Sequence, residues 1–388
     1  MTKSIKELDS EYIAHSYSRF PVVLKEGKGS VIRDEDGKEY IDLGSGIAVN
    51  IFGIGDEQWV SAVTEQLNKL QHMSNLYYSE PCAKLAELLC EKTGMKKVFF
   101  CNSGAEANEC AIKAARKYAK DTKGVDCKII TLVNSFHGRT ITTLAATGQE
   151  VFHKDFTPLT EGFIYAGAND LDSVKKLMET NDVAAVMMES VQGEGGVMPL
   201  EEKFVKGVAE LCREHGALLV MDEVQTGNGR TGKLYGYMNF GVTPDIVTTA
   251  KGIGGGLPLG VCMLGEKVQD VFQPGLHGST FGGNPVCCAG AISIMERIDE
   301  ELLRQVREKS DYVFKALQGA KGVKSVSGMG LMIGVETERP AKDIVADCME
   351  QGVLVLTAKT KVRLLPALNI PMDELEKAVA VLKAACGK

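Results

Sequence analysis

Long apolar runs and isolated basic clusters are missing from this sequence, and each absence removes a class of protein. No run approaches the roughly eighteen apolar residues that a membrane helix needs. The longest candidates, such as residues 183–188, suit buried strands. Lysine and arginine together number 44 against 51 acidic residues, a net charge of −7. We therefore expect neither nucleic acid nor a membrane as a partner.

Paired cysteine motifs are also missing. The eleven cysteines include no CxxC pair, so neither a zinc site nor a redox dithiol is expected. Reduced, buried thiols and no bound metal are the prediction. The first twenty residues carry scattered charges without an apolar centre, unlike a secretory signal. These features predict a cytoplasmic protein.

The length and the composition indicate an ordinary folded protein with more than one core. The chain has 388 residues, 44% of them apolar and 24% charged, and a chain of this length usually divides into domains. Short apolar runs alternate with stretches of helical spacing, which is typical of a mostly parallel sheet flanked by helices. We predict an α/β domain over residues 50–272 and a smaller α+β domain over 273–388. Residues 1–49 are expected to pack with the smaller domain.

The predicted elements follow from hydrophobic pattern. Five continuously apolar segments are typical of strands buried on both faces, and they cover residues 97–101, 128–133, 184–189, 218–222 and 246–250. Helices are predicted at 105–120 and 203–215. In the last third, helices at 300–317 and 372–385 flank strand-like segments at 323–336 and 353–366. A hairpin is predicted at 31–43, around Asp36 and Gly37.

Polar residues directly after the predicted strands are the first candidates for a site, because ligands of α/β sheets gather at the carboxyl ends of strands. Ser103, Gly104 and Ala105 follow one such strand and begin a helix, where free N–H groups and the helix dipole favour an anion. This pattern predicts a phosphate site. The alternative is a plain helix cap, in which Ser103 and Glu106 form a capping box.

Asp222 and Lys251 each end a predicted buried strand. An acid at Asp222 would stay ionised against a ring nitrogen and keep a pyridinium protonated; otherwise it is a helix cap or an ion-pair partner. Burial lowers the pKa of a lysine and makes Lys251 a nucleophile for carbonyls. Its alternative is a lysine that extends to solvent from a loop.

A third polar segment, Ser135–Thr140, follows the strand at 128–133. Phe136 offers a flat aromatic face for a ring, and Arg139 a guanidinium for a carboxylate. Core packing and a surface ion pair are the alternatives. Residues 227–232 fit the dinucleotide pattern GxGxxG, but glycines and Pro244 occupy the place where its helix should begin. A Walker loop fails as well, because Leu234 replaces the Ser or Thr that binds magnesium.

Taken together, these segments resemble the class III, fold-type I pyridoxal-phosphate aminotransferases, and most closely the acetylornithine aminotransferases. The similarity covers nearly the whole chain. The segments are NSGAEANECAIKAARKYA from Asn102, NSFHGRT from Asn134, QGEGGV from Gln192, MDEVQTGNGRTGKL from Met221, TTAKGIGGGLPLG from Thr248, HGSTFGGNP from His277, GMGLMIG from Gly328 and VRLLPAL from Val362.

The resemblance implies pyridoxal phosphate as the cofactor and assigns a role to each matching residue. Lys251 would bind the cofactor covalently and then carry the proton between substrate and cofactor. Asp222 would pair with the pyridine nitrogen and Gln225 with the phenolic oxygen. The remaining cofactor residues would be Ser103, Gly104 and Ala105 at the phosphate, Phe136 on the ring face, and Thr280 from the other subunit of a homodimer.

The resemblance also implies which residues bind the two substrates. Arg139 would bind the α-carboxylate of acetylornithine and Arg363 that of glutamate, because arginine recognises a carboxylate with two parallel hydrogen bonds. Glu194 would neutralise Arg363 while the first substrate is bound. Ser279 would touch the substrate across the subunit interface, and Tyr17, with Arg19, would lie near the entrance.

Two segments depart from the family pattern. Residues 51–57 stand where the family has Gly-His and then His-Pro, and Ser190 replaces a proline. The first departure concerns how the early helix meets the cofactor domain. The second concerns the turn that presents Gln192 and Glu194, and hence the exchange between substrates.

The implied reaction is transfer of the terminal amine of N2-acetylornithine to 2-oxoglutarate in arginine biosynthesis, giving N-acetylglutamate 5-semialdehyde and glutamate. Other amine donors of the same chemistry stay open: ornithine, succinylornithine, γ-aminobutyrate and N-succinyl-diaminopimelate precursors. An aminomutase of the same fold would move the amine within one molecule and would not require 2-oxoglutarate. A catalytically silent cofactor-binding protein is the third alternative, although Lys251, Asp222 and both arginines argue against it.

Overall fold

A seven-stranded sheet forms the centre of the larger of two domains in the computed structural model, which describes residues 3–388. The strand order is β4-β12-β11-β10-β7-β5-β6. Its strands are β4 (Lys97–Cys101), β5 (Lys128–Leu132), β6 (Phe163–Ala166), β7 (Val183–Glu189), β10 (Leu218–Asp222), β11 (Ile246–Thr249) and β12 (Gly260–Leu264). Strand β12 is antiparallel to both neighbours, whereas the pairs from β11 to β6 are parallel.

Successive residues of the central strands enter two different cores, because side chains alternate across a sheet. On β7, Val186 lies in the core that contains Phe204, whereas Ala185 lies in the core that contains Ala111. Both faces of the sheet are therefore covered by helices, which explains why these strands are continuously apolar. The predicted α/β fold with a mostly parallel sheet is confirmed. The sequence did not indicate β6 and β12.

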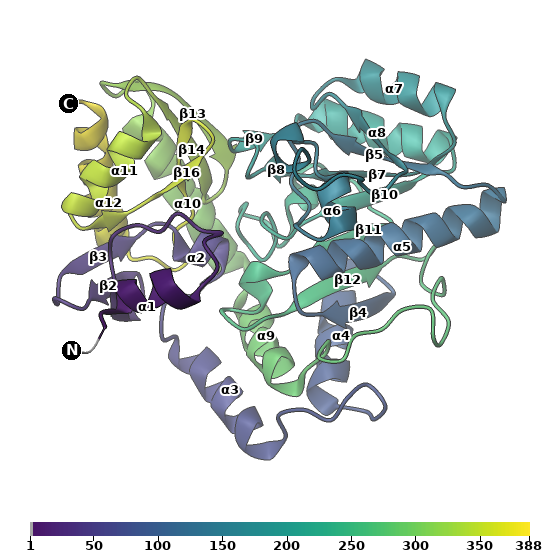
Figure 1. Cartoon of the computed structure of the whole chain (residues 1–388), viewed down its shortest axis with the longest axis horizontal. Helices are drawn as coiled ribbons and strands as arrows, with labels where there is room; N and C mark the ends of the chain where they lie inside the picture. Colours follow the sequence, from purple (N-terminus) through teal and green to yellow (C-terminus); the bar gives the residue numbers. More distant parts are fainter. Residues whose placement is uncertain (1–2) are drawn as a thin grey trace.

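The helices of the larger domain divide between the two faces of the sheet (Figure 1). Helix α5 (Gly104–Lys123) covers one face with small side chains, including Ala111 and Ala115, which allow close approach to the strands. The opposite core receives α4 (Glu80–Thr93), α8 (Glu202–Glu214) and α9 (Pro285–Arg297). The other elements are α3 (Glu57–Lys69), α6 (Ile141–Ala146), η1 (Glu150–Phe152), α7 (Leu171–Thr180), β8 (Val191–Gln192), β9 (Met198–Pro199), η2 (Gly236–Asn239) and η3 (Lys251–Ile253).

The smaller domain combines the two ends of the chain, which lie on the same side of the molecule (Figure 1). One sheet has the order β1-β2-β3-β15 and consists of β1 (Leu24–Lys28), β2 (Val31–Asp34), β3 (Glu39–Asp42) and β15 (Val353–Leu354). The other has the order β13-β14-β17-β16 and consists of β13 (Val323–Met329), β14 (Met332–Thr337), β17 (Lys361–Leu364) and β16 (Leu356–Ala358). Its helices are α1 (Ile5–Tyr12), α2 (Ser45–Ala48), α10 (Glu300–Leu317), α11 (Ala341–Glu350) and α12 (Met372–Cys386).

The packing of α9 bears on where the smaller domain begins. Helix α9 contacts α3 and α4, and its Ile294 and Met295 belong to the core of the large sheet. Helix α10 enters both cores: Val306 belongs to the core of the large sheet, whereas Val313 and Leu317 belong to the core of the smaller domain. The predicted boundary at residue 273 therefore lies before a helix that packs in the larger domain, because a helical pattern does not reveal which core receives its apolar face.

The two segments that depart from the family pattern form ordered local structure. Asp56 caps α3, its Oδ1 accepting a hydrogen bond from Trp59 N at 2.9 Å, and it forms an ion pair with Arg297 at 2.8 Å. Ser190 follows β7, and its Oγ donates to Glu223 Oε1 at 2.8 Å. Among the helices of residues 3–388, none combines the length and the apolar character that crossing a membrane requires.

Candidate active site

A cavity of about 480 Å³ lies at the carboxyl ends of the central strands. It is lined by predicted site residues from four separate segments of the chain, namely Ser103, Gly104, Ala105, Phe136, Arg139, Asp222, Gln225 and Lys251. The parallel strands bring these segments together, because their carboxyl ends meet at one edge of the sheet.

The N-terminus of α5 forms one wall of this cavity. Ser103 is the N-cap residue: its Oγ accepts a hydrogen bond from Glu106 N at 3.2 Å and donates one to Glu106 Oε2 at 2.9 Å. A Cβ atom added to Gly104 would lie 2.7 Å from Val224 Cγ1, so only glycine fits there. Ser103 therefore caps the helix, but the predicted capping box is incomplete, because the main-chain donor to Glu106 Oε2 is Asn102 N, at 3.1 Å. A capped helix end is compatible with an anion held there.

Asp222 is the most tightly held acid of the cavity and is 3% exposed. Its Oδ2 lies 2.7 Å from His137 Nδ1 and accepts a hydrogen bond from Asn108 Nδ2 at 2.8 Å, while its Oδ1 accepts one from Val224 N at 3.0 Å. Burial alone would lower the pKa of His137, but the hydrogen bond and the charge of Asp222 outweigh burial and raise it. His137 and Asn108 therefore fix the position of the Asp222 carboxyl group.

Lys251 follows β11 in a turn of unusual backbone conformation. Its φ is 49°, in the left-handed region that non-glycine residues rarely adopt. Asn228, from a different loop, stabilises this turn: its Nδ2 donates to Thr249 Oγ1 at 2.9 Å and to Ala250 O at 3.3 Å. Burial lowers the pKa of the Lys251 amine, although the charges of Glu194 and Asp222 oppose this effect. A lowered pKa increases the fraction of the nucleophilic, uncharged amine.

Arg363, Glu194 and Gln225 form a connected group beside the cavity. Arg363 lies on β17 of the smaller domain, and its Nη1 donates to Glu194 Oε1 at 2.6 Å and to Gln225 Oε1 at 3.3 Å. Burial raises the pKa of Glu194, but the charge of Arg363 and its hydrogen bond outweigh burial and lower it. Within residues 3–388, Arg363 Nε is buried without a hydrogen-bond partner. The smaller domain thus supplies a guanidinium with unused donor capacity.

Phe136 and Arg139 lie together on the loop after β5. The Arg139 guanidinium lies over the rings of Phe152 and Phe136, at 4.5 and 5.6 Å from their centroids. Both Phe136 and Arg139 line the cavity, and Arg139 is exposed. Phe136 is only partly buried, so it is not the core residue of the first alternative. Among residues 3–388, no acidic side chain forms a salt bridge with Arg139, so the second alternative, a surface ion pair, is not observed either.

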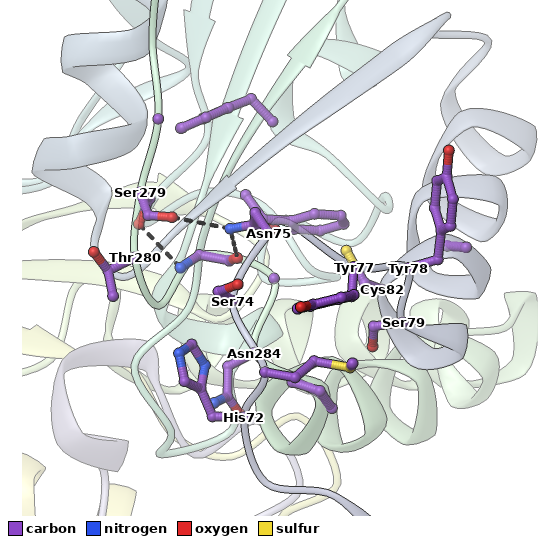
Figure 2. A pocket seen from close by; sticks show the side chains of 18 of the residues that line it. His72, Ser74, Asn75, Tyr77, Tyr78, Ser79, Cys82, Ser279, Thr280 and Asn284 are labelled. Atoms are coloured by element: carbon purple, nitrogen blue, oxygen red, sulfur yellow. Dashed lines mark hydrogen bonds between the residues drawn. The ribbon is translucent and has the colours of Figure 1, made fainter. Parts of the chain in front are cut away.

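Three predicted residues lie away from the cavity that contains Lys251. Ser279 and Thr280 line a second, open cavity of about 490 Å³, together with Asn75 (Figure 2). There Asn75 Nδ2 donates to Ser279 O at 2.9 Å. Tyr17 is 73% exposed, and the Arg19 guanidinium lies over its ring. One chain alone does not bring these residues to Lys251.

Sequence reasoning missed several residues of the site. Asn108 and His137 hold Asp222, Glu189 lines the cavity, and Asn228 supports the turn before Lys251. Asn108, His137 and Asn228 lie inside segments that carried the resemblance, so their positions were visible although their contacts were not. Glu189 lies outside those segments. Its indication in the sequence was its position as the last residue of a predicted buried strand, which is also the position of Asp222.

The donors in the cavity suit pyridoxal phosphate. A helix N-terminus suits a phosphate group, the held carboxylate of Asp222 suits a ring nitrogen, and the amine of Lys251 suits an aldehyde. Phe136 adds an aromatic face for a ring. The chemistry of these residues therefore fits the cofactor that the sequence implied.

Comparisons with known proteins identify a family that matches almost the entire chain. The family model described as "Aminotransferase class-III" matches residues 12–386. The acetylornithine aminotransferase of Haemophilus ducreyi is 51% identical over 97% of both chains, and that of Aquifex aeolicus is 46% identical over 96% of this chain and 99% of its own.

Two solved structures show the same fold. The N-acetylornithine aminotransferase of Stenotrophomonas maltophilia has a TM-score of 0.84 at 37% identity and covers 98% of this chain and 97% of its own. The ornithine aminotransferase of Toxoplasma gondii has a TM-score of 0.95 at 31% identity, with 98% and 94% covered.

Proposed function

The chain belongs to the class-III aminotransferases, and we propose that it transfers the terminal amine of N2-acetylornithine to 2-oxoglutarate. The products are N-acetylglutamate 5-semialdehyde and glutamate, a step of arginine biosynthesis. The relatives named acetylornithine aminotransferase support this substrate pair. The observation that carries the proposal is the Arg363–Glu194 pair beside the cavity, because two unlike substrates require a carboxylate-binding arginine that can be occupied or released.

Pyridoxal phosphate is the cofactor of this enzyme class. When bound, it supplies an aldehyde that reacts with amines and a ring that accepts electrons. We propose that Lys251 holds it through the side-chain amine and then moves a proton at the reacting carbon. The lowered pKa of the Lys251 amine supports this role as a base.

The other cofactor contacts follow from the walls of the cavity. Ser103, Gly104 and Ala105 are proposed to hold the phosphate at the N-terminus of α5. Asp222 would keep the ring nitrogen protonated, and Gln225 would bind the phenolic oxygen. Phe136 would cover one face of the ring, which also restricts the access of water.

Two arginines are proposed to bind the α-carboxylates of the two substrates. Arg139 would bind the α-carboxylate of N2-acetylornithine, since it lies exposed at the cavity. Arg363 would bind the α-carboxylate of glutamate after Glu194 releases it. Exchange of one carboxylate for another keeps the buried guanidinium paired, which avoids the cost of an isolated buried charge.

We further propose a homodimer with shared active sites. Thr280 would complete the phosphate site of the partner subunit, and Ser279 would touch its substrate. The large exposed side chains near the second cavity, Leu76, Tyr77, Tyr78 and Phe281, support an interface there. Tyr17 would reach the entrance of the site only within such an assembly or after the N-terminal segment moves.

All eleven cysteines are free thiols, which suits a reducing compartment. We therefore propose that the enzyme acts in the cytoplasm.

The function is tested with purified enzyme, pyridoxal phosphate and a panel of amine donors. We expect N2-acetylornithine to have the highest kcat/KM and turnover to require 2-oxoglutarate. Ornithine is the second candidate, favoured by the TM-score of 0.95 to an ornithine aminotransferase. Preference for ornithine would reject the proposed substrate, and turnover without 2-oxoglutarate would indicate an aminomutase.

A further inference from the structure

The buried acid Glu189 also lines the cavity. It is the last residue of β7, it is 5% exposed, and it lines the same cavity as Lys251. The register of the sheet pairs it with Asp222 on β10. The side chain therefore lies between the cofactor residues and the loops that follow β5 and β7.

The two oxygens of Glu189 bind two different loops. Oε1 accepts a hydrogen bond from Phe136 N at 2.9 Å, and Oε2 accepts one from Gly193 N at 3.3 Å. The first loop carries Arg139, three residues after Phe136. The second loop carries Glu194, directly after Gly193, and Glu194 is the partner of Arg363.

We propose that Glu189 is a positioning residue that holds both substrate-reading loops, so that one carboxyl group supports Arg139 for one substrate and Glu194 for the other. This inference rests on the proposed function for the identity of the two substrates. The contacts of Glu189 themselves do not depend on it.

The chemistry of the carboxyl group suits this bridging role. It offers two acceptor oxygens on one carbon, whereas an amide offers one acceptor and one NH₂ donor. Two main-chain N–H donors that face the same side chain are therefore both satisfied by Glu189, and glutamine at this position would satisfy only one. A buried N–H group without a partner is strongly unfavourable.

Three titratable groups surround Glu189. His137, Asp222 and Lys251 face it from three elements. Burial raises its pKa to about 8; His137 opposes this shift, and Asp222 adds to it. The main-chain N–H groups of Phe136 and Gly193 also oppose the rise, because their hydrogen bonds favour the ionised carboxylate, in which both oxygens accept.

Two substitutions separate bridging from a general structural role. Glu189→Met removes both acceptors at similar volume, and Glu189→Gln removes one. The direct readout is hydrogen exchange of the main-chain amides in the peptides that contain Phe136 and Gly193. We expect the Met variant to exchange about tenfold faster or more in both peptides, and the Gln variant in only one.

The functional readout is the dissociation constant of each substrate, measured from the cofactor absorbance in separate half-reactions of the holoenzyme. The Met variant should raise the constants for both N2-acetylornithine and 2-oxoglutarate by about tenfold. The constant for pyridoxal phosphate should rise less than the two substrate constants, because the phosphate site at the N-terminus of α5 stays intact and only the ring contact of Phe136 lies on a loop that Glu189 holds. A general loss of structure would instead weaken the binding of all three to a similar extent.

Ser190→Ala is the matched control. Ser190 is adjacent in sequence and equally buried, but its hydroxyl binds Glu223 and neither substrate loop. We expect unchanged exchange in both peptides and unchanged substrate constants. Unchanged exchange in the Met variant, or a change confined to one peptide, would overturn the bridging role; if the Met variant does not fold, unchanged exchange of both peptides in the Gln variant would do so.

The exchange experiment also separates this inference from the proposed function. If no donor supports turnover but both peptides exchange faster in the Met variant, the substrate assignment fails and the bridging role stands. If N2-acetylornithine is the substrate but exchange does not change, the role of Glu189 fails alone.

Discussion

Arg363 Nη1 donates a hydrogen bond to Glu194 Oε1 at 2.6 Å, and only 4% of the arginine side chain is exposed. The two residues come from different domains, Arg363 from β17 and Glu194 from the turn between β8 and β9. A buried guanidinium needs an anion beside it. The pair therefore joins the two domains beside the proposed substrate site.

Replacement of Arg363 should separate the two half-reactions. We expect Arg363→Ala to lower kcat/KM for 2-oxoglutarate by about 100-fold, because a charged hydrogen-bond partner of the carboxylate is lost. The half-reaction with N2-acetylornithine should change much less. Single-turnover absorbance with each substrate measures both effects; Arg139→Ala is the complementary variant, and equal losses in both half-reactions would contradict the assignment.

Lys251→Ala should abolish turnover and remove the absorbance band near about 400–430 nm that a lysine-bound cofactor produces. Pyridoxal phosphate should still bind without a covalent bond, since Ser103, Gly104 and Ala105 are intact. Equilibrium dialysis measures this binding. Persistence of the band in the variant would show that another amine holds the cofactor.

Asn228 should matter for the orientation of Lys251. Asn228→Ala removes the hydrogen bonds to Thr249 Oγ1 and Ala250 O that support the turn with a φ of 49° at Lys251. We expect the free energy of unfolding to fall by about 1–3 kcal/mol, and kcat to fall more than KM rises. Chemical denaturation and steady-state kinetics test this.

Asn239→Ala is the control for Asn228. Asn239 Nδ2 also donates two hydrogen bonds, to Thr231 Oγ1 at 3.2 Å and Gly236 O at 3.0 Å, but it does not bind the turn before Lys251. It should lower stability without the loss of kcat. Equal kinetic effects of the two variants would contradict a specific role for Asn228.

Glu189 should make stability depend on pH. Its pKa is raised from 4.5 to about 8 in the folded protein. Between these values the native state binds more protons than the unfolded state, so this contribution to stability is present below pH 4.5 and is lost as the pH rises towards 8. Glu189→Gln carries no titrating proton. The free energy of unfolding of this variant should therefore fall less over this pH range than that of the unmodified protein.

Thermal unfolding from pH 5 to 8.5 tests this prediction. When the free energy of unfolding is plotted against pH, the slopes of the two proteins should differ by at most about 1.4 kcal/mol per pH unit, which corresponds to one proton. His137 and Asp222 remain in both proteins, but the charge of Glu189 also raises the pKa of His137, so the difference between the slopes reports Glu189 together with its effect on His137. Parallel curves would contradict the raised pKa.

Thr280 should act on the active site of the partner subunit. We expect a mass of two chains in solution, and Thr280→Ala should weaken pyridoxal phosphate binding by about tenfold because one phosphate hydrogen bond is lost. Mixed dimers of the Thr280→Ala and Lys251→Ala chains contain one site with both lesions and one with neither. Recovery of activity on mixing supports sharing, and its absence under conditions of subunit exchange contradicts it.

Much of the fold was predictable because local pattern reports local environment. The segments at 97–101 and 218–222 match β4 and β10 at both ends, and the predicted helix at 300–317 matches α10. Their continuous apolar character followed from burial on both faces. Strand β12 was missed, since its five residues follow a glycine-rich turn and carry no separate periodic signal.

Candidate site residues could be predicted where several reactive or polar residues are adjacent in the sequence. The sequence by itself determined the family, the lysine and acid at strand ends, and the helix N-terminus after β4, because each is a short motif in a readable context.

Only the tertiary structure decided which distant side chains meet. Asn228 binds the turn before Lys251, Arg363 binds Glu194 from another domain, and Glu189 joins the loops of Phe136 and Gly193. Such contacts depend on how domains and loops pack, and side chains far apart in sequence carry no local pattern that records them. The residues proposed for the reaction could therefore be predicted from the sequence, whereas the residues that hold them in place could be identified only in the folded chain.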